Sequence, residues 1–410
     1  EKFMQGARSW LDFLKIRGSW GQNGNQDIAG YQYLSTYSFT NADYTFGPDK
    51  SVTTTGAYAD ILANPDITWE TSEQTSLGFD ARFLGGRLGL NFDYYIKKTK
   101  DWLVQAPILA TTGTGAPFIN GGDVKNTGIE VALSWNDKVA ELNYGATLNF
   151  AYNKNKVTRI ANTEGIIHGE INVLSNATDE MYRTQVGKPI GFFYGYKTAG
   201  IFQNEEEIAT YKGAKLDGAK PGDVIWVDTN HDGKITVDDR TMIGDPHPDC
   251  TIGFSLNASW RGFDLAATFA GQTGNQIMKS YRSFVDYPNN NYTTDILKRW
   301  HGDGTSTRWP RLTSTTSNNW QWVSDLYMED GDYLRCQNIT LGYDFKRLLK
   351  NLPVQQLRLY FAANNLFTIT GYSGMDPEVG YGGSASWASG IDLGFYPSPR
   401  TYMVGLNVKF

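Results

Sequence analysis

The sequence predicts an all-β fold in the form of a transmembrane antiparallel β-barrel. Many segments alternate apolar and polar residues with period two, the pattern of a strand that has two different faces. The connections between these segments alternate between short and long. Aromatic residues also gather near the segment ends, as they do in the girdles of barrels at the two lipid–water interfaces; these are Trp20, Trp102, Trp135, Trp260, Tyr402 and Phe410.

The composition agrees with this fold class. Only 20% of the 410 residues are charged, 14% are aromatic and 44 are glycine, which suits strands and turns better than helices. The mean hydropathy of −0.42 is compatible with a membrane barrel, because lipid-facing and lumen-facing residues alternate and average out. No apolar run reaches about 18 residues, so we expect no transmembrane helix.

Ten segments alternate over enough residues to form long strands. In the clearest of them, Leu142, Tyr144 and Leu148 lie on one face, and Asn143 and Thr147 lie on the other. A tilted transmembrane strand needs about 9–11 residues, which most of these segments supply with short extensions. The ten segments are 14–21, 76–83, 88–97, 129–135, 142–152, 252–260, 263–270, 338–345, 357–364 and 402–410.

The connections distinguish a barrel from a soluble sandwich, which also alternates. Short turns on one rim and long extracellular loops on the other are typical of outer-membrane barrels, whereas structureless loops of this length argue against a soluble domain. Short helices are expected at 204–211 and 294–301. The short turns are 84–87, 136–140, 261–262 and 346–353, and the long loops are 22–68, 104–123, 155–250, 271–328 and 367–399.

The chain is expected to be one part of a larger barrel. Wide barrels have 22 strands and a plugged lumen, and about ten strands are present here. The opening stretch EKFMQGARSW has neither a basic start nor an apolar core, so it does not resemble a signal peptide. We therefore interpret residues 1–410 as the C-terminal portion of the barrel, with the plug and the N-terminal strands upstream of Glu1.

A calcium-loop pattern is the sharpest local motif. The stretch DTNHDGKITVDD at 228–239 follows D-x-[DN]-x-[DN]-G, and calcium needs six to eight hard oxygen ligands wrapped around one point. The last position holds Asp where such loops usually have Glu, and no flanking helices are evident, so an ion-free turn is the alternative. We expect a structural Ca²⁺ held by Asp228, Asn230, Asp232, Lys234 (through its carbonyl), Thr236 and Asp239.

Other chemistries have little support. The four histidines lack zinc-site spacing, and no nucleophile or phosphate-loop motif occurs. Acidic pairs such as Glu205–Glu207 are expected by chance among 43 acidic residues, so we predict no enzyme. The net charge of −6 argues against nucleic acid as a partner. Cys250 and Cys336 lie in different segments and are expected to be free thiols.

Three tryptophans in the predicted loops are candidate substrate-binding residues. Trp320 and Trp322 lie in the stretch NNWQWV, and Trp387 lies in SASWAS. Aromatic faces can stack on sugar rings or on a partner protein. The alternative is that these side chains pack loops against one another.

Several stretches together resemble the SusC/RagA family of TonB-dependent outer-membrane transporters. These are NGGDVKNTGIE at 120–130, GFFYGYKTAGIFQ at 191–203, the region 221–263 with its acidic loop followed by IGDPHP, GYSGMDPE at 371–378 and YPSPRTYMVGLNVKF at 396–410. The last stretch ends in an alternating strand with an aromatic C-terminus, similar to the signal read by the barrel-assembly machinery. The resemblance extends over nearly the whole chain.

The resemblance implies import of oligomeric nutrients, most often glycans and sometimes peptides, across the outer membrane of a Bacteroidetes-like Gram-negative bacterium. It further implies a SusD-like surface lipoprotein as a lid and TonB as the energy source, acting through an N-terminal region that this sequence lacks. The competing hypothesis is an outer-membrane or cell-surface β-protein that binds a ligand without transporting it.

Overall fold

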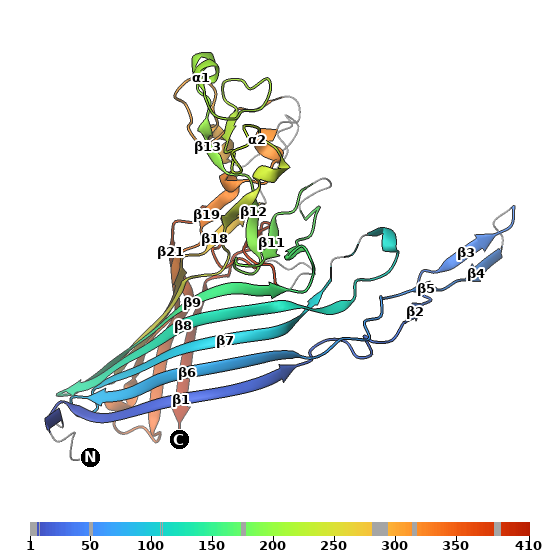
Figure 1. Ribbon diagram of the computed structural model, residues 1–410. Helices are drawn as coiled ribbons and strands as arrows, with labels where there is room; N and C mark the ends of the chain where they lie inside the picture. Colours follow the sequence, from blue (N-terminus) through green and yellow to red (C-terminus); the bar gives the residue numbers. More distant parts are fainter. Residues whose placement is uncertain are drawn as a thin grey trace.

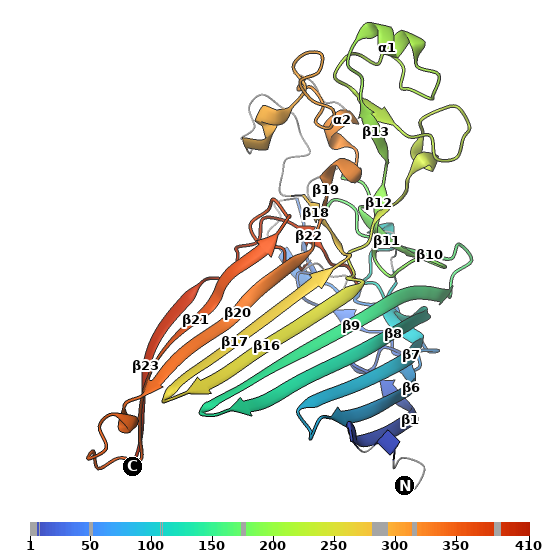
Figure 2. The same ribbon diagram turned by 90° about the vertical axis from the view of Figure 1, so that its left-hand side faces the viewer.

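The computed structural model describes residues 6–7, 9–48, 52–106, 108, 110–173, 178–280, 294–313, 318–380 and 387–410. Its main element is a curved antiparallel sheet of ten long strands (Figures 1 and 2). Each strand overlaps one of the ten segments predicted from alternation, so the presence of these strands is confirmed. Several strands extend well beyond the predicted bounds, most of all the strand predicted at 129–135, which spans Phe118–Val139. In spatial order the strands are β1 (Leu11–Asn25), β6 (Glu70–Phe83), β7 (Leu88–Gln105), β8 (Phe118–Val139), β9 (Leu142–Ile160), β16 (Cys250–Trp260), β17 (Phe263–Thr273), β20 (Tyr333–Asp344), β21 (Gln356–Thr370) and β23 (Thr401–Lys409).

The sheet is an open wall. Neighbours in sequence are neighbours in space, and β1 and β23 form its two edges without pairing to each other in the described part of the chain. This is the all-β, barrel-wall architecture that the alternation predicts. Membership of a barrel with 22 strands stays a prediction.

The short turns all lie at one end of the sheet, together with the start of β1 and the C-terminus (Figure 1). The turn between β16 and β17 has only Arg261 and Gly262, both with positive φ (50° and 92°), the conformation that matches the twist of the flanking strands. The turn after β8 is shorter than predicted, because the strand continues to Val139. The long connections lie at the other end, so the predicted asymmetry is confirmed.

The strand register divides the sheet into two faces. Tyr94, Ile129 and Tyr152 lie opposite one another on what we call the apolar face, and the adjacent row of Tyr95, Gly128 and Asn153 lies on what we call the polar face. Aromatic residues of the predicted girdle, including Trp20 and Tyr402, lie exposed on the apolar face. Each strand therefore has the two-sided character of a barrel wall.

Glycines on the polar face allow side chains to interact across an intervening strand. Gly78 lies between Arg17 and Asp93 in the register, and the Arg17 guanidinium donates to the Asp93 carboxylate at 2.7 Å. Arg358, which lies diagonally from Gly342 in the register, reaches over that glycine and donates to the Asp264 carboxylate at 2.8 Å. These bonds tie together strands that do not touch through their backbones.

Replacing Gly78 by alanine is expected to lower the free energy of unfolding of the full-length protein by about 1–3 kcal/mol. A Cβ at Gly78 would lie 2.3 Å from Asp93 Oδ1 and 2.4 Å from the Phe92 carbonyl oxygen. Urea unfolding in lipid vesicles measures the change. Gly18→Ala is the matched control, because nothing lies within 4 Å of its Cβ position. Equal midpoints for the two variants would contradict the explanation.

Three of the long connections, which join β9 to β16, β17 to β20 and β21 to β23, fold into a lobe above the sheet, a feature that alternation did not predict. It contains small sheets, short helices and a core of its own, which includes Met181, Phe193, Tyr196 and Tyr327. Its elements are β10 (Ile166–His168), β11 (Tyr182–Gln185), β12 (Phe192–Gly195), β13 (Thr198–Ile201), α1 (Glu205–Thr210), β14 (Val224–Trp226), η3 (Val237–Asp239), β15 (Thr241–Gly244), β18 (Gln276–Lys279), η4 (Thr294–Lys298), α2 (Asn318–Gln321), η5 (Asp325–Tyr327), β19 (Met328–Asp330) and β22 (Ile391–Asp392).

Both predicted short helices are present. Asn204 caps α1 by accepting a hydrogen bond from the Glu207 backbone N–H at 2.9 Å, while η4 is a shorter 3₁₀ helix. In the described ranges, no helix combines the length and apolar character needed to cross a bilayer. Cys250 and Cys336 are free thiols, as expected. The remaining elements are β2 (Tyr37–Ser38), β3 (Asp43–Phe46), β4 (Val52–Thr55), β5 (Tyr58–Ala59), η2 (Ala110–Thr112) and η6 (Phe345–Arg347).

The lobe leans over the polar face. Val124 and Val157 of that face are buried in one cluster, against which Ile190 and Trp387 of the long connections pack. Since the lobe covers the polar face and leaves the apolar face open, the polar face is the inner side of the wall. The apolar face is then the outer side.

Candidate functional site

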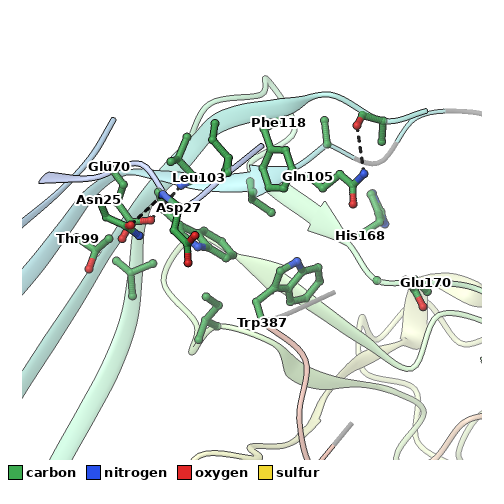
Figure 3. Close-up of a pocket in the computed structure, with 18 of the residues that line it drawn as sticks. Asn25, Asp27, Glu70, Thr99, Leu103, Gln105, Phe118, His168, Glu170 and Trp387 are labelled. Carbon is green, nitrogen blue, oxygen red and sulfur yellow. Dashed lines mark hydrogen bonds between the residues drawn. The ribbon is translucent and has the colours of Figure 1, made fainter. Parts of the chain in front are cut away.

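A cavity of about 1200 Å³ opens on the polar face where the strands meet the lobe (Figure 3). Its walls come from the end of β1, the start of β6, the ends of β7 and β9, and the start of β8. Four long connections also contribute, namely those between β1 and β6, β7 and β8, β9 and β16, and β21 and β23. Lining residues that carry polar or aromatic groups are Asn25, Asp27, Glu70, Thr99, Trp102, Gln105, Phe118, Asn126, Asn155, His168, Glu170 and Trp387.

A β-bulge turns Trp102 into this cavity. The register between β7 and β8 shifts after Thr99, and Asp101 has φ of +54°. The bulge is fixed because the Asp101 N–H donates to Asp123 at 2.9 Å and its carbonyl accepts from Asn120 at 2.9 Å. An extra residue in one strand reverses which face the following side chains occupy. Our interpretation of Trp102 as a girdle aromatic is therefore wrong.

The opposite wall comes from the lobe. Asn155 of β9 accepts a hydrogen bond from the Ile190 N–H at 2.8 Å, which holds the lobe against the sheet. His168 lies between the carboxylates of Glu164 and Glu180, with a ring nitrogen 3.2 Å from each. Glu180 is almost fully buried and also pairs with Arg183 at 2.5 Å. These contacts fix the segment after β10 as a rigid wall.

Trp387 forms an aromatic corner at the bottom of the cavity as drawn in Figure 3. Its ring meets Trp102 edge to face at 6.4 Å and Tyr182 at 5.1 Å, in the T-shaped geometry that aromatic pairs favour. Trp387 remains only partly buried and keeps a surface toward the cavity. Its predicted role in binding thus fits its position.

The other two predicted tryptophans lie elsewhere. Trp320 is 2% exposed, and its indole N–H donates to the Arg311 carbonyl at 3.0 Å. Trp322 stacks on Tyr196 with a centroid distance of 4.3 Å inside the lobe core. Both side chains pack loops against one another, which is the alternative given above for this group. The structure does not bring them to the cavity.

The cavity lining is acidic and rich in hydrogen-bonding groups. Asp27, Glu70 and Glu170 contribute carboxylates, amides come from asparagines and Gln105, and no Lys or Arg is among the described lining residues. The Glu70 carboxylate also accepts from the Leu103 N–H at 3.2 Å. Carboxylates and amides beside aromatic faces suit a neutral polyhydroxylated ligand, or a cationic one, and repel an anionic one.

The first half of the predicted calcium loop is folded around its carboxylates. Asp228 accepts from the Gly233 N–H at 2.8 Å, Asn230 from the Asp232 N–H at 2.9 Å, and Asp232 from the Lys234 N–H at 2.8 Å. Burial alone would raise the pKa of Asp228, but backbone hydrogen bonds outweigh it and lower the pKa below its ordinary value. Asp228 is therefore ionised at neutral pH, as a cation ligand must be.

The last position of the loop departs from the pattern. Asp239 is fully buried, and its carboxylate accepts from the Thr229 and Thr236 backbone N–H groups at 2.8 and 2.7 Å. It therefore caps η3 and is turned to the backbone. In the described parts of the chain, no three His, Cys, Asp or Glu side chains gather in a metal-binding arrangement. The donors that fit a cation are Asp228, Asn230, Asp232 and the Lys234 carbonyl.

Comparison with known proteins identifies the architecture. The family model described as "TonB dependent receptor-like, beta-barrel" matches residues 6–366. The chain belongs to this family. It is 32% identical over 424 residues to the TonB-dependent receptor P3 of Formosa agariphila, and 27% identical over 417 residues to the TonB-dependent receptor SusC of Bacteroides thetaiotaomicron.

The barrel is of the SusC/RagA type, as the resemblance indicated. The solved structure of the RagAB peptide transporter matches all of this chain with a TM-score of 0.78 and 25% sequence identity. The chain spans 42% of that transporter chain and 40% and 39% of the lengths of P3 and SusC. The cavity and the lobe are thus features of a TonB-dependent receptor barrel.

We propose that the acidic loop binds Ca²⁺ weakly, in the range of about 10⁻⁴–10⁻³ M that extracellular modules show. Calorimetric titration of the full-length protein with CaCl₂ measures this affinity. Asp232→Asn should weaken binding about tenfold, since a charged ligand is lost. Asp238→Asn is the control, because Asp238 lies outside the ligand pattern. An absence of binding up to low-millimolar Ca²⁺ would refute the proposal.

Proposed function

We propose that this chain forms part of the wall, the extracellular lobe and the ligand entrance of an outer-membrane importer of oligomeric nutrients. Neutral oligosaccharides are the proposed substrate class, and the proposed role is transport rather than catalysis. The location would be the outer membrane of a Gram-negative, Bacteroidetes-like bacterium. Support comes from membership of the receptor barrel family and from relatives in Formosa and Bacteroides.

The proposed partners follow from the SusC/RagA type. A SusD-like surface lipoprotein would cover the lobe side, and TonB would supply energy through a region outside residues 1–410. The lobe favours such a partner, because a folded surface with its own core presents a fixed shape to a lid.

The single observation that carries the substrate proposal is the cavity on the polar face. Trp387 and Phe118 provide aromatic surface beside a set of amides and carboxylates, which matches the alternating apolar and hydroxyl faces of a sugar ring. The volume of about 1200 Å³ accommodates several sugar units, since it lies slightly above the range of about 300–1,000 Å³ that is usual for pockets of drug-sized ligands. Its acidic lining disfavours sulfated and uronic-acid chains.

A cationic peptide is the second candidate substrate. The acidic lining would attract Lys and Arg side chains, and the structural match is a peptide transporter. Uptake assays with the intact gene in its host separate the candidates. Fluorescent neutral oligosaccharides, uronate oligosaccharides and basic peptides of equal size are compared between the wild type and a gene deletion. Loss of neutral-oligosaccharide uptake alone supports the proposal, and unchanged uptake of all three refutes import.

Trp387→Ala should weaken binding of the imported oligosaccharide about tenfold, because the ligand loses an aromatic face and its edge-to-face support. Calorimetry on the full-length protein in detergent provides the measurement. Trp260→Ala is the matched control, since that ring is exposed on the apolar face at the short-turn end. Equal affinities of the two variants for the oligosaccharide would mean that the cavity is not its binding site.

A further inference from the structure

A patch of lysines lies on the apolar face near the lobe end of the sheet. Lys98 of β7, Lys125 of β8 and Lys156 of β9 lie directly opposite one another in the strand register. Lys100 and Lys154 occupy the same face one step away. We call these five residues the lysine patch. All except Lys125, which is half-buried, are exposed.

Aligned lysines on adjacent strands repel one another. Side chains directly opposite in an antiparallel pair have Cβ atoms about 5 Å apart, and like charges at such positions destabilise the sheet. Two such contacts follow in succession here, from Lys98 to Lys125 and from Lys125 to Lys156. An anion bound between the ammonium groups would remove this repulsion.

Neighbouring acidic groups neutralise only part of the charge. Glu73 pairs with Lys100 at 2.6 Å and lies opposite Lys98, while Asp101 and Asp123 pair with Arg159 at 2.8 and 2.9 Å. Six basic groups thus face three acidic ones. Within the described ranges, no salt bridge engages Lys125 or the lysines of β9.

The height of the patch matches one boundary of a membrane. Lys98 lies ten residues along β7 from Leu88, which faces Trp135 at the short-turn end. Ten residues span about 33 Å along a strand, and a tilt of about 40° reduces this to about 25 Å. That is the height of the lipid-facing band of outer-membrane barrels. The patch therefore lies at the headgroup level on the long-loop side.

The charge is confined to three strands. The outward residues at the corresponding ends of the next four strands are uncharged, namely Cys250, Thr273, Leu334 and Ile369. Below the patch, Tyr94, Ile129 and Tyr152 form a continuous apolar row. Lysines that only extend toward water at the membrane surface would occur on all strands. Their confinement to three strands favours a localised ligand with an anionic head and apolar tails.

We propose that the lysine patch binds the phosphate group of a phosphorylated glycolipid in the outer leaflet, with its acyl chains lying on Tyr94, Ile129 and Tyr152. Ammonium groups form charge-assisted hydrogen bonds with phosphate oxygens, which are shorter and stronger than neutral ones. This rests on the proposed outer-membrane location, because only the outer leaflet places a lipid headgroup at the long-loop end.

The test compares lipid binding by the full-length protein and by a charge-removed variant. Protein in nanodiscs of neutral phosphatidylcholine is titrated with monophosphorylated lipid A and with its dephosphorylated form, and bound lipid is counted by native mass spectrometry. The K98Q/K125Q/K156Q variant should bind the phosphorylated lipid more weakly, by about fivefold for each lysine removed. The K98R/K125R/K156R variant should retain binding, which separates a charge effect from misfolding.

The control variant K188Q/K212Q/K220Q removes three exposed lysines of the lobe and should bind like the wild type. Equal binding of phosphorylated and dephosphorylated lipid, or equal loss in both glutamine variants, would overturn the proposal. Competition by millimolar inorganic phosphate to the same extent as by lipid would assign the patch to a free anion instead, which also overturns it.

Failure of this inference is distinguishable from failure of the proposed function. Cell fractionation first reports whether the protein is in the outer membrane, on which both depend. In outer membranes, K98Q/K125Q/K156Q should leave the cavity on the opposite face unaltered, so oligosaccharide affinity should match the wild type. Lipid binding without oligosaccharide uptake would refute import and leave the lipid site supported. Oligosaccharide uptake without selectivity for the phosphorylated lipid would support import and refute the lipid site.

Discussion

Replacing Arg335 by leucine is expected to destabilise the full-length protein by about 3–5 kcal/mol, because two acidic side chains lose their shared partner. Arg335 lies on β20 and is 4% exposed. Its guanidinium donates to Asp376 and Glu378, each at 2.5 Å, and to the Thr368 hydroxyl at 3.0 Å. Urea unfolding in lipid vesicles measures the loss.

The same network gives a pH dependence. Burial alone would raise the pKa of Asp376, but hydrogen bonds from the Ser398 and Glu378 N–H groups and the Arg335 guanidinium lower it below its ordinary value. A carboxyl group with a depressed folded-state pKa stabilises the fold above its unfolded pKa, and this contribution is lost as the pH falls through the folded value. Stability should therefore decrease in acid, and less so in the Arg335→Leu variant.

Arg347→Leu provides the matched control for Arg335. Arg347 pairs with Glu141 at 2.6 Å, but both side chains are about half exposed, so the pair should contribute about 0–1 kcal/mol. If the two variants lose equal stability, the argument from burial is wrong. The connection between β21 and β23 also carries Trp387, so detaching it in Arg335→Leu should weaken oligosaccharide binding as well.

Phe193→Ala should destabilise the lobe by about 3–5 kcal/mol, since it removes a large side chain from a packed core. Phe193 is fully buried among Met181, Tyr327 and Ile391 in the lobe core. The ten-stranded sheet contributes none of its residues to that cluster, so it should remain folded. Limited proteolysis should cut the lobe of the variant while the strands stay protected.

Phe395→Ala is the control for this variant, because Phe395 is 41% exposed and lies outside the core. If the lobe has its own core, the barrel should survive in Phe193→Ala. Loss of the whole barrel in this variant, measured as loss of heat-modifiable migration on gels, would contradict that explanation. That result would mean that the lobe and the sheet unfold as one unit. The expected result would show that the long connections form a separately stabilised element.

The strands and their two faces could be predicted because they depend on local pattern. Alternation with period two marks a strand, and positions such as Ile129 and Tyr152 fall on the predicted apolar face. The two-residue turn at Arg261–Gly262 is likewise favoured by a glycine, which adopts positive φ without steric cost. These features depend on neighbours along the chain or on the adjacent strand.

The cavity could not be predicted because its walls come from distant segments. Asp27, Glu70 and Trp387 meet only after the sheet and the lobe have folded. Trp320 and Trp387 both occur among small polar loop residues, yet one is buried in the lobe core and the other faces the cavity. Nothing in the local pattern distinguishes these two environments.

By itself, the sequence determined the ten strands, the rim that carries the short turns, the family resemblance and the pattern of the acidic loop. The tertiary structure decided that three of the long connections fold into a lobe, that a bulge turns Trp102 inward, and that three lysines of separate strands share one row. The reason is that backbone geometry imposes its period on every strand independently. Contacts between side chains that are distant in sequence depend instead on strand register and on packing between loops.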